Sequence, residues 1–250
     1  MADSTRQLLQ SAYVLRQRPY RDSSVLLEVF SATHGRIGVV AKGVRRRRNS
    51  PRALLQSFTP LLLSWVGRGD LVTLTDVESR APRYLLQGVV LMSGFYLNEL
   101  LLRLLQRQDP YPALFSYYDQ ALKKMARLGT QITTDAALPV ILRIFEKQLL
   151  EEMGYGLVLD FDVEGEAVSA DRFYRYQAGL GLIPLLSVSE AGVDSLRGAH
   201  LQALATHRLD ECSARGVKRL LRTAIDQHLG NKPLQSRKML LEMRRDMAQG

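Results

Sequence analysis

Residues 24–41 read SVLLEVFSATHGRIGVVA, in which two apolar runs are separated by the turn-forming pair His34-Gly35. The runs at 24–30 and 36–41 are rich in Val, Leu, Ile and Phe, a composition that predicts two β-strands joined by a turn. The first run is apolar on both faces of its pleat. One face should therefore fill a core, while another element of the protein covers the other face.

Three more runs of this kind lie at 11–17, 60–66 and 71–77, and turn-forming Gly, Asn, Ser and Pro residues separate the runs. Five short strands within residues 1–80 favour a small closed barrel. Such barrels include the OB-fold, whose exposed strand face and loops bind oligonucleotides. We therefore expect residues 1–80 to form an OB-fold nucleic-acid-binding domain.

A helical period dominates residues 81–250, which are expected to form a second domain. Residues 84–106 are apolar all round and predict a central helix that is buried on most sides. Asp109-Pro110 is predicted to start the second helix, and Thr134 to cap a third helix that ends at Gly154.

Residues 155–192 lose the helical period, contain several glycines and predict a small β-containing insertion. Helices are expected to resume near Ser195 and to include a one-sided apolar stripe at 217–229. The last helix is expected at 236–248 and to bury Met239, Leu240, Met243 and Met247. The predicted fold class is therefore α+β, with a five-stranded OB-fold barrel packed on a mainly helical domain.

Charge is distributed unevenly along the chain, whose formal net charge is +9. Residues 1–80 carry 13 Lys/Arg against 6 Asp/Glu, residues 81–207 carry 11 against 14, and residues 208–250 carry 10 against 5. Two basic ends around a slightly acidic middle indicate a polyanionic partner such as nucleic acid.

The most concentrated positive charge is the segment 42–52, KGVRRRRNSPR, between the third and fourth predicted strands. Adjacent arginines repel each other and cannot share one helical face, so a loop that binds phosphates is favoured over a merely solvated turn. Guanidinium groups also match the geometry of phosphate oxygens. The candidate DNA-binding residues of this loop are Lys42, Arg45, Arg46, Arg47, Arg48 and Arg52.

A second group of candidate DNA-binding residues lies on or beside the first three strands and comprises Arg16, Arg18, Tyr20, Arg21 and Arg36. Cations for the backbone, together with aromatic rings for the bases, are typical of single-strand recognition. Tyr13 and Phe30 are interleaved with these cations, but single aromatic residues belong more often to a core. Tyr20 is the preferred stacking residue because it follows Pro19 at a strand end.

A secondary basic patch is predicted near the C-terminus, from Lys218, Arg219, Arg222, Lys232, Arg237 and Lys238. These cations could extend a nucleic-acid track or bind an acidic peptide of a partner. Polar helix faces are also commonly rich in Lys and Arg for solubility alone.

Sequence motifs of catalysis are absent: there is no P-loop, no HExxH, no Gly-rich dinucleotide turn and no zinc-ligand spacing. Cys212 is the single cysteine, and His200 and His207 have no acidic or Cys ligand in register. We therefore expect a protein that is not an enzyme and that takes no cofactor, metal or small-molecule substrate.

Four acidic residues alternate in the predicted insertion, at Asp160, Asp162, Glu164 and Glu166. They lack the pattern of a calcium loop and predict a solvated turn. The N-terminus has no apolar signal region, and the longest uncharged apolar-rich run is too short to cross a bilayer. A cytoplasmic location is expected.

Eight short stretches, in order along nearly the whole chain, resemble the RecO family of bacterial recombination mediators: 13–16, 18–24, 35–37, 40–43, 58–63, 96–101, 154–156 and 232–237. The resemblance implies an OB barrel packed on a helical domain with a small insertion. Some members hold zinc with four cysteines in that insertion. This chain has no cysteine between residues 155 and 192, so we expect a zinc-free insertion.

The same resemblance implies binding of single- and double-stranded DNA and annealing of complementary strands. It also implies binding of the acidic tail of single-strand-binding protein, and work with RecR, and with RecF as a further candidate, in loading RecA at the bacterial nucleoid. From the residues alone, an RNA-binding OB protein, a protein adaptor with basic ends and a nuclease stay open as alternatives.

Overall fold

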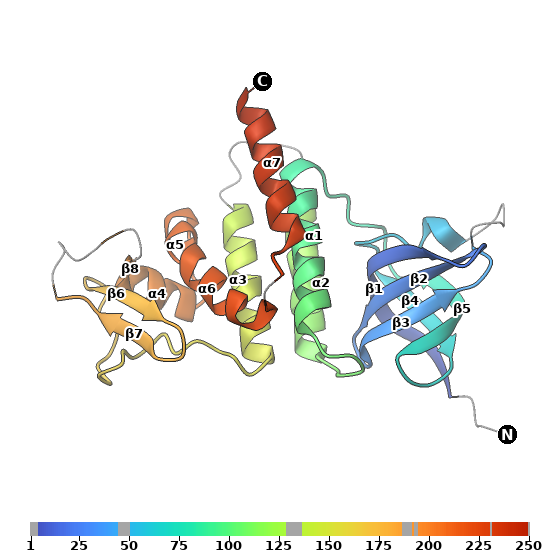
Figure 1. Ribbon diagram of the computed structural model, residues 1–250, viewed down its shortest axis with the longest axis horizontal. Coiled ribbons are helices and arrows are strands. Elements are labelled where there is room, and N and C mark those ends of the chain that lie inside the picture. Colours follow the sequence, from blue (N-terminus) through green and yellow to red (C-terminus); the bar gives the residue numbers. More distant parts are fainter. Residues whose placement is uncertain are drawn as a thin grey trace. The chain divides into compact units, whose positions relative to one another are not determined.

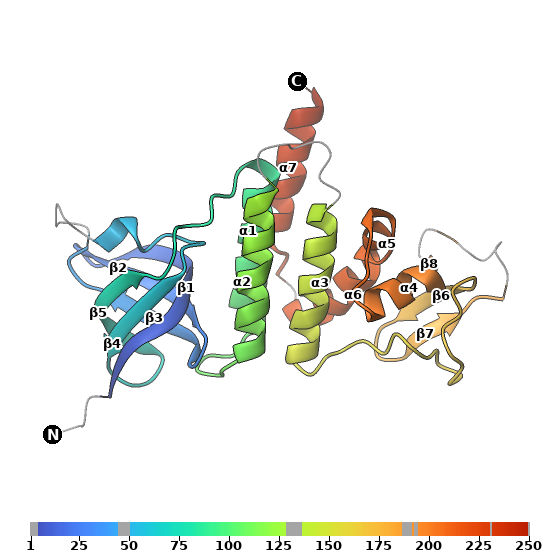
Figure 2. The same ribbon diagram turned by 180° about the vertical axis from the view of Figure 1, so that it is seen from behind.

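The structure is a computed structural model that describes residues 5–44, 51–128, 137–186, 192, 195–230 and 232–249. The chain forms two compact units. The first comprises residues 1–129 and 234–250, and the second comprises residues 130–233. Figure 1 labels their helices and strands, and Figure 2 shows the reverse side.

The first unit begins with a closed five-stranded barrel whose strands follow the order β1-β2-β3-β5-β4. The strands are β1 (Arg6–Tyr20), β2 (Ser24–Ser31), β3 (Gly35–Ala41), β4 (Leu61–Val66) and β5 (Leu71–Ser79), and a short 3₁₀ helix η1 (Pro51–Ala53) precedes β4. This barrel confirms the predicted fold class. β1 is longer than its predicted core of residues 11–17 because both of its ends pair, one with β4 and the other with β2.

Alternate side chains of the strands fill the barrel, among them Val14, Leu27, Val39 and Leu63, which are all fully buried. The opposite face of β1 and β2 is covered, as the two-sided apolar pattern predicts. Tyr13 and Phe30 lie there against Phe115 on helix α2 (Pro112–Arg127), with ring centroids 5.5 and 5.4 Å apart. These two aromatic residues are therefore core residues and not stacking surfaces.

Helices α1 (Gly88–Leu104) and α2 run side by side next to the barrel in both views (Figures 1 and 2). α1 starts four residues after the predicted position, and Leu85 is 72% exposed, so the expectation of burial on most sides holds only for the later turns. The predicted start of α2 at Asp109-Pro110 is wrong. Pro112 takes the first turn instead, and the Asp109 carboxylate accepts a hydrogen bond from the Tyr111 hydroxyl at 2.6 Å.

The last helix, α7 (Gln235–Gln249), belongs to the first unit although 104 residues of the second unit separate it from the rest. It packs on α1. The prediction that this helix buries Met239 is wrong, because that side chain is 53% exposed. Leu234 just before α7 and Ser236 in its first turn are buried, whereas Leu240 and Met243 are only half-buried.

The second unit contains α3 (Ala137–Glu152), α4 (Gly198–Ala205), α5 (Glu211–Gly216), α6 (Lys218–Leu229) and a three-stranded sheet. The sheet has the order β7-β6-β8, with β6 (Phe173–Gln177), β7 (Gly181–Pro184) and β8 (Ser195–Arg197). Residues 195–197 are therefore a strand, and the helical region resumes at Gly198 instead of Ser195. Thr134, the predicted cap of the third helix, lies outside the described residues.

The interior of the insertion is apolar, with Leu159, Val168, Tyr174, Leu182 and Leu196 buried. Asp162 is also buried, unlike the solvated turn that was expected, and its Oδ1 accepts the backbone N–H groups of Glu164 and Glu166 at 2.9 and 3.1 Å. This carboxylate holds the turn together. Across the part of the chain that the structure describes, no group of three His, Cys, Asp or Glu residues is placed to hold a metal ion.

Candidate nucleic-acid interface

The outer face of β1 presents three of the candidate residues in a row. Arg16 pairs with Glu28, Arg18 with Leu26 and Tyr20 with Ser24 across the β1–β2 ladder. Both arginines are exposed, and neither forms an ion pair with a described residue. Because alternate residues of a strand share a face, their Cα atoms repeat at about 6.7 Å.

A β-bulge places these arginines on the outside of the barrel. Val14 pairs with Val29 inside the barrel, and the register then shifts so that Arg16 pairs with Glu28 on the outside. The extra residue is Leu15, whose carbonyl oxygen accepts a hydrogen bond from Asn98 Nδ2 at 2.9 Å. Without this bulge the two-residue period would place Arg16 and Arg18 in the apolar interior.

The turn after β1 adds a cation and an aromatic ring. Arg21, at φ 52°, places its guanidinium carbon 5.3 Å from the centroid of the half-buried Tyr20 ring. Arg21 is itself exposed, so a cation and a partly exposed aromatic face lie together at this end of the barrel.

Arg36 has a different environment from the other candidates. Its Nη1 donates a hydrogen bond to the Leu102 carbonyl oxygen at 2.8 Å and lies 3.9 Å from Glu28 Oε2. Burial lowers the pKa of Arg36, and the positive charges of Arg107 and Arg16 lower it further. We therefore assign Arg36 mainly to the contact between β3 and α1.

The basic loop is described at its two ends. Lys42 follows β3 and is exposed, and Arg52 lies on η1 and is exposed. Arg45, Arg46, Arg47 and Arg48 lie outside the described residues. The loop therefore leaves the barrel at the end of β3, where Ala41 pairs with Val25 of β2.

The C-terminal cations are divided between the two units. Lys218, Arg219 and Arg222 are on the exposed side of α6, and Arg222 lies 3.5 Å from Asp226. Lys232 is exposed and belongs to the same unit. Arg237 and Lys238 are on α7 of the first unit, with Arg237 5.6 Å from the Tyr96 ring centroid and Lys238 3.9 Å from Glu242.

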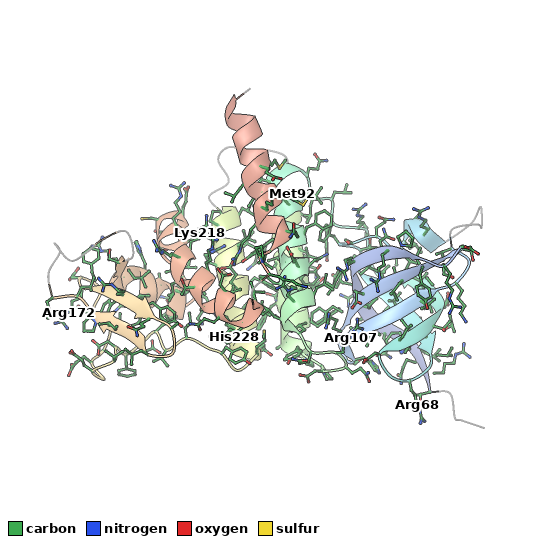
Figure 3. All side chains as sticks on the ribbon, viewed as in Figure 1. Arg68, Met92, Arg107, Arg172, Lys218 and His228 are labelled. Atoms are coloured by element: carbon green, nitrogen blue, oxygen red, sulfur yellow. The ribbon has the colours of Figure 1, made fainter. Side chains whose placement is uncertain are left out.

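One cation of this surface could not be identified from the sequence. Arg107 lies in the connection between α1 and α2 (Figure 3). Its Nη2 donates a hydrogen bond to Glu28 Oε1 at 2.6 Å. It stands alone in a polar segment, RQDPY, so neither charge density nor periodicity distinguishes it.

Known families match both parts of the chain. The family description "Recombination protein O N terminal" matches residues 5–83, and "Recombination protein O C terminal" matches residues 86–238. The chain belongs to the RecO family. A "DNA repair protein RecO" from Nitrosococcus oceani is 49% identical over 242 residues, which cover 96% of this chain and 95% of that protein.

Two further RecO relatives are similar over nearly their whole length. The "DNA repair protein RecO" of Methylococcus capsulatus is 45% identical over 239 residues, with 95% of this chain and 94% of the relative covered. That of Coxiella burnetii is 41% identical over 234 residues, with 93% and 97% covered. The RecO resemblance is thus confirmed, and with it a place among DNA repair and recombination proteins. Among the described residues, no helix has the length and apolar character that crossing a membrane requires.

Proposed function

We propose that this RecO-family chain binds single- and double-stranded DNA through the outer face of its barrel. On this account it anneals complementary strands and helps load RecA onto DNA that is coated with single-strand-binding protein. The observation that carries the proposal is the row on one pleat of β1 formed by the exposed Arg16 and Arg18 and the half-buried Tyr20. Two cations followed by an aromatic ring suit a phosphate backbone with a stacked base at one end.

The proposed DNA track continues from this row into the basic loop. Its residues are Arg16, Arg18, Tyr20, Arg21, Lys42, Arg45, Arg46, Arg47, Arg48 and Arg52, all within the OB-fold domain of residues 1–80. The loop joins the barrel at the end of β3 that lies beside the same end of β2 as Tyr20. A DNA strand that passes along Arg16, Arg18 and Tyr20 would therefore reach the loop.

Annealing requires no covalent step on this account. Each DNA strand carries closely spaced negative charges, and cations that neutralise phosphates on two strands lower their mutual repulsion. Stacking of unpaired bases on Tyr20 would hold them apart until pairing replaces the stacking. The chain is proposed to act as a mediator and not as an enzyme, with no cofactor.

Protein partners are proposed for the helical domain of residues 81–250. They are RecR, the acidic tail of single-strand-binding protein and, as a further candidate, RecF. The exposed cations of α6, Lys218, Arg219 and Arg222, match the charge of such a tail. Either an acidic peptide or DNA could use these cations.

Annealing of complementary oligonucleotides tests this proposal. The wild type is compared with Arg16→Ala/Arg18→Ala, with a variant in which Arg45 to Arg48 are Ala, and with the control Arg127→Ala at the far end of α2. We expect both multiple variants to anneal at least tenfold more slowly and the control to match the wild type. Equal rates in all four proteins would reject the barrel face as the DNA site, and preference for RNA in a competition assay would favour an RNA-binding protein.

A further inference from the structure

A row of four paired residues crosses the outer face of the barrel at right angles to its strands. Arg16 on β1 pairs with Glu28 on β2, Glu28 with Gly38 on β3, and Gly38 with Leu71 on β5. With neighbouring strands about 4.8 Å apart, the row spans about 14 Å. Arg16 and Leu71 at its two ends are exposed, and Glu28 near its middle is buried.

Arg107, in the connection between α1 and α2, contacts this row. Its Nη2 lies 2.6 Å from Glu28 Oε1, and its Nη1 donates to the Asp70 carbonyl oxygen at 3.3 Å. Glycine at position 38 makes this approach possible, because a Cβ atom on Gly38 would lie 3.2 Å from Arg107 Nη1 and 2.7 Å from Asp70 O.

The segment that carries Arg107 is fixed in place by its neighbour. The Gln108 backbone N–H donates to the Arg36 carbonyl oxygen at 3.0 Å, and Gln108 Nε2 donates to Asp70 Oδ1 at 2.7 Å. The guanidinium of Arg107 is thereby held over β3 instead of extending freely into solvent. Because the side chain is already ordered, binding of a ligand costs less conformational entropy.

Three arginines outnumber the two carboxylates at this site. Arg36 and Arg107 both lie within 4.0 Å of Glu28, and Arg16 faces it from the next strand. The second carboxylate, Asp70, accepts the hydrogen bond from Gln108 and acts on Arg36. The side chain of Arg107 is 31% exposed, and its guanidinium has five N–H donors for the two acceptors that it contacts. Several donors therefore remain for a ligand from solvent.

A buried ion pair of the second unit shows what a purely structural pair looks like in this protein. Arg143 and Glu146 on α3 are 2.6 Å apart, with 9% and 0% of their side chains exposed. Both side chains of that pair are enclosed. The Glu28 cluster differs because the side chain of Arg107 is 31% exposed and so reaches the surface.

We infer that Arg107 binds a phosphodiester group of a DNA strand that crosses the row. Glu28 is the residue that positions the guanidinium of Arg107. This inference deepens the proposed function and rests on it. Arg16 binds a neighbouring phosphate on one side, and the exposed Leu71 side chain contacts sugar or base on the other. The DNA surface thus includes a residue supplied by the connection between α1 and α2.

Titration of binding to an oligothymidylate at a series of salt concentrations tests the inference. The variants are Arg107→Ala, Arg107→Lys, and Arg107→Ala combined with Glu28→Gln, with Arg127→Ala as the control. The combined variant removes one charge of each sign, so no buried carboxylate loses its partner, and it gives the decisive result even where Arg107→Ala alone fails to fold.

Loss of one phosphate contact should make the slope of log affinity against log salt shallower by about 0.7. At low salt the affinity of the combined variant should fall about tenfold, which is about 1.4 kcal/mol. Arg107→Lys keeps the charge and should restore the slope. A combined variant with the wild-type slope and affinity overturns the role of Arg107.

The two proposals fail in distinguishable ways. If Arg16→Ala makes the slope shallower and the Arg107 variants do not, the barrel face binds DNA without Arg107. If the wild type shows no salt-dependent binding at all, the proposed function fails together with this inference.

Discussion

Glu99 on α1 caps the first turn of α7 through Ser236. Its Oε2 accepts the Ser236 backbone N–H at 2.8 Å and the Ser236 hydroxyl at 2.5 Å, while Oε1 accepts the Gln235 backbone N–H at 2.9 Å. The first N–H groups of a helix have no partner within it, and a negative charge there also suits the helix dipole. One side chain therefore attaches the C-terminal helix to the first unit across 137 positions of sequence.

Glu99→Ala should detach the start of α7. The variant leaves two backbone N–H groups without their acceptor, so the free energy of unfolding of the first unit should fall by about 1 to 2 kcal/mol. Urea denaturation followed by the fluorescence of Trp65, the single tryptophan, reports on this unit. Glu242→Ala on the exposed side of α7 is the matched control and should stay near the wild type; equal losses in both variants would contradict the capping role.

Asp119 on α2 joins the barrel to the helices and should make stability depend on pH. It accepts hydrogen bonds from the hydroxyls of Tyr13 and Tyr84 and from Lys123 Nζ. Burial alone would raise the pKa of Asp119, but these donors outweigh it and lower the pKa below its ordinary value of 3.8. The folded state therefore favours the carboxylate, and this stabilisation is present above pH 3.8 and lost as the pH falls through the lower folded value.

Asp119→Asn should therefore reduce the free energy of unfolding at neutral pH, by about 1 to 2 kcal/mol. The difference from the wild type should shrink as the pH falls below 3.8. Denaturation curves from pH 7 to pH 3, with the exposed Asp76→Asn as control, give the measurement. A difference that stays constant over this range would show that the charge of Asp119 has no part in the effect.

His207 gives the second unit a pH dependence in a different range. Lys147 Nζ lies 2.9 Å from His207 Nε2, so this nitrogen accepts the hydrogen bond only while the ring is neutral. Burial lowers the pKa of His207, and the positive charge of Lys147 lowers it further. As the pH falls, His207 is therefore protonated at a higher pH in the unfolded chain than in the folded chain. Folding stability falls as the pH drops through 6.5.

His207→Asn should remove this pH dependence of the second unit. Asn tolerates the φ of 55° at this position and has no titrating group. Hydrogen exchange of α3 amides at pH 8 and at pH 5.5 compares the two proteins. The wild type should lose protection at the lower pH more than the variant does; the same loss in both would assign the effect to other groups.

The sequence predicts the barrel and most helices because their signals are local. Val25, Leu27 and Val29 show their period within one strand, and the stripe on α6 shows its period within one helix. The predicted start of α2 is wrong by two residues because two prolines, Pro110 and Pro112, both suit a helix start. Only the tertiary position of Asp109, whose carbonyl oxygen lies against Gly35, decides between them.

The candidate interface is predictable only in part because it depends on pairing across the sheet. The sequence identifies the exposed cations Arg16 and Arg18, but the bulge at Leu15 that turns them outward depends on Asn98 of α1. The structural contacts of Arg36 and the position of Arg107 over Gly38 likewise depend on residues far away in the chain. Non-local contacts of this kind leave no periodic signal.

Tyr20 should contribute to DNA affinity through its ring and not through its hydroxyl. Tyr20→Phe should bind an oligothymidylate like the wild type, whereas Tyr20→Leu should lose the stacking of one base, about 1 to 3 kcal/mol. The loss should persist at high salt, because stacking involves no counterion release. Equal affinity of the Leu and Phe variants would exclude Tyr20 as a stacking residue.

The salt dependence of single-strand binding tests the central claim most directly. Three proteins are compared: the wild type, Arg16→Ala/Arg18→Ala on β1, and Lys218→Ala/Arg219→Ala/Arg222→Ala on α6. If the barrel face binds the DNA backbone, the slope of log affinity against log salt should become shallower by about 1.4 for the β1 variant, which is about 0.7 for each lost phosphate contact. The slope of the α6 variant should stay near that of the wild type. An unchanged slope for the β1 variant together with a shallower slope for the α6 variant would contradict the account and place the DNA on the helical domain.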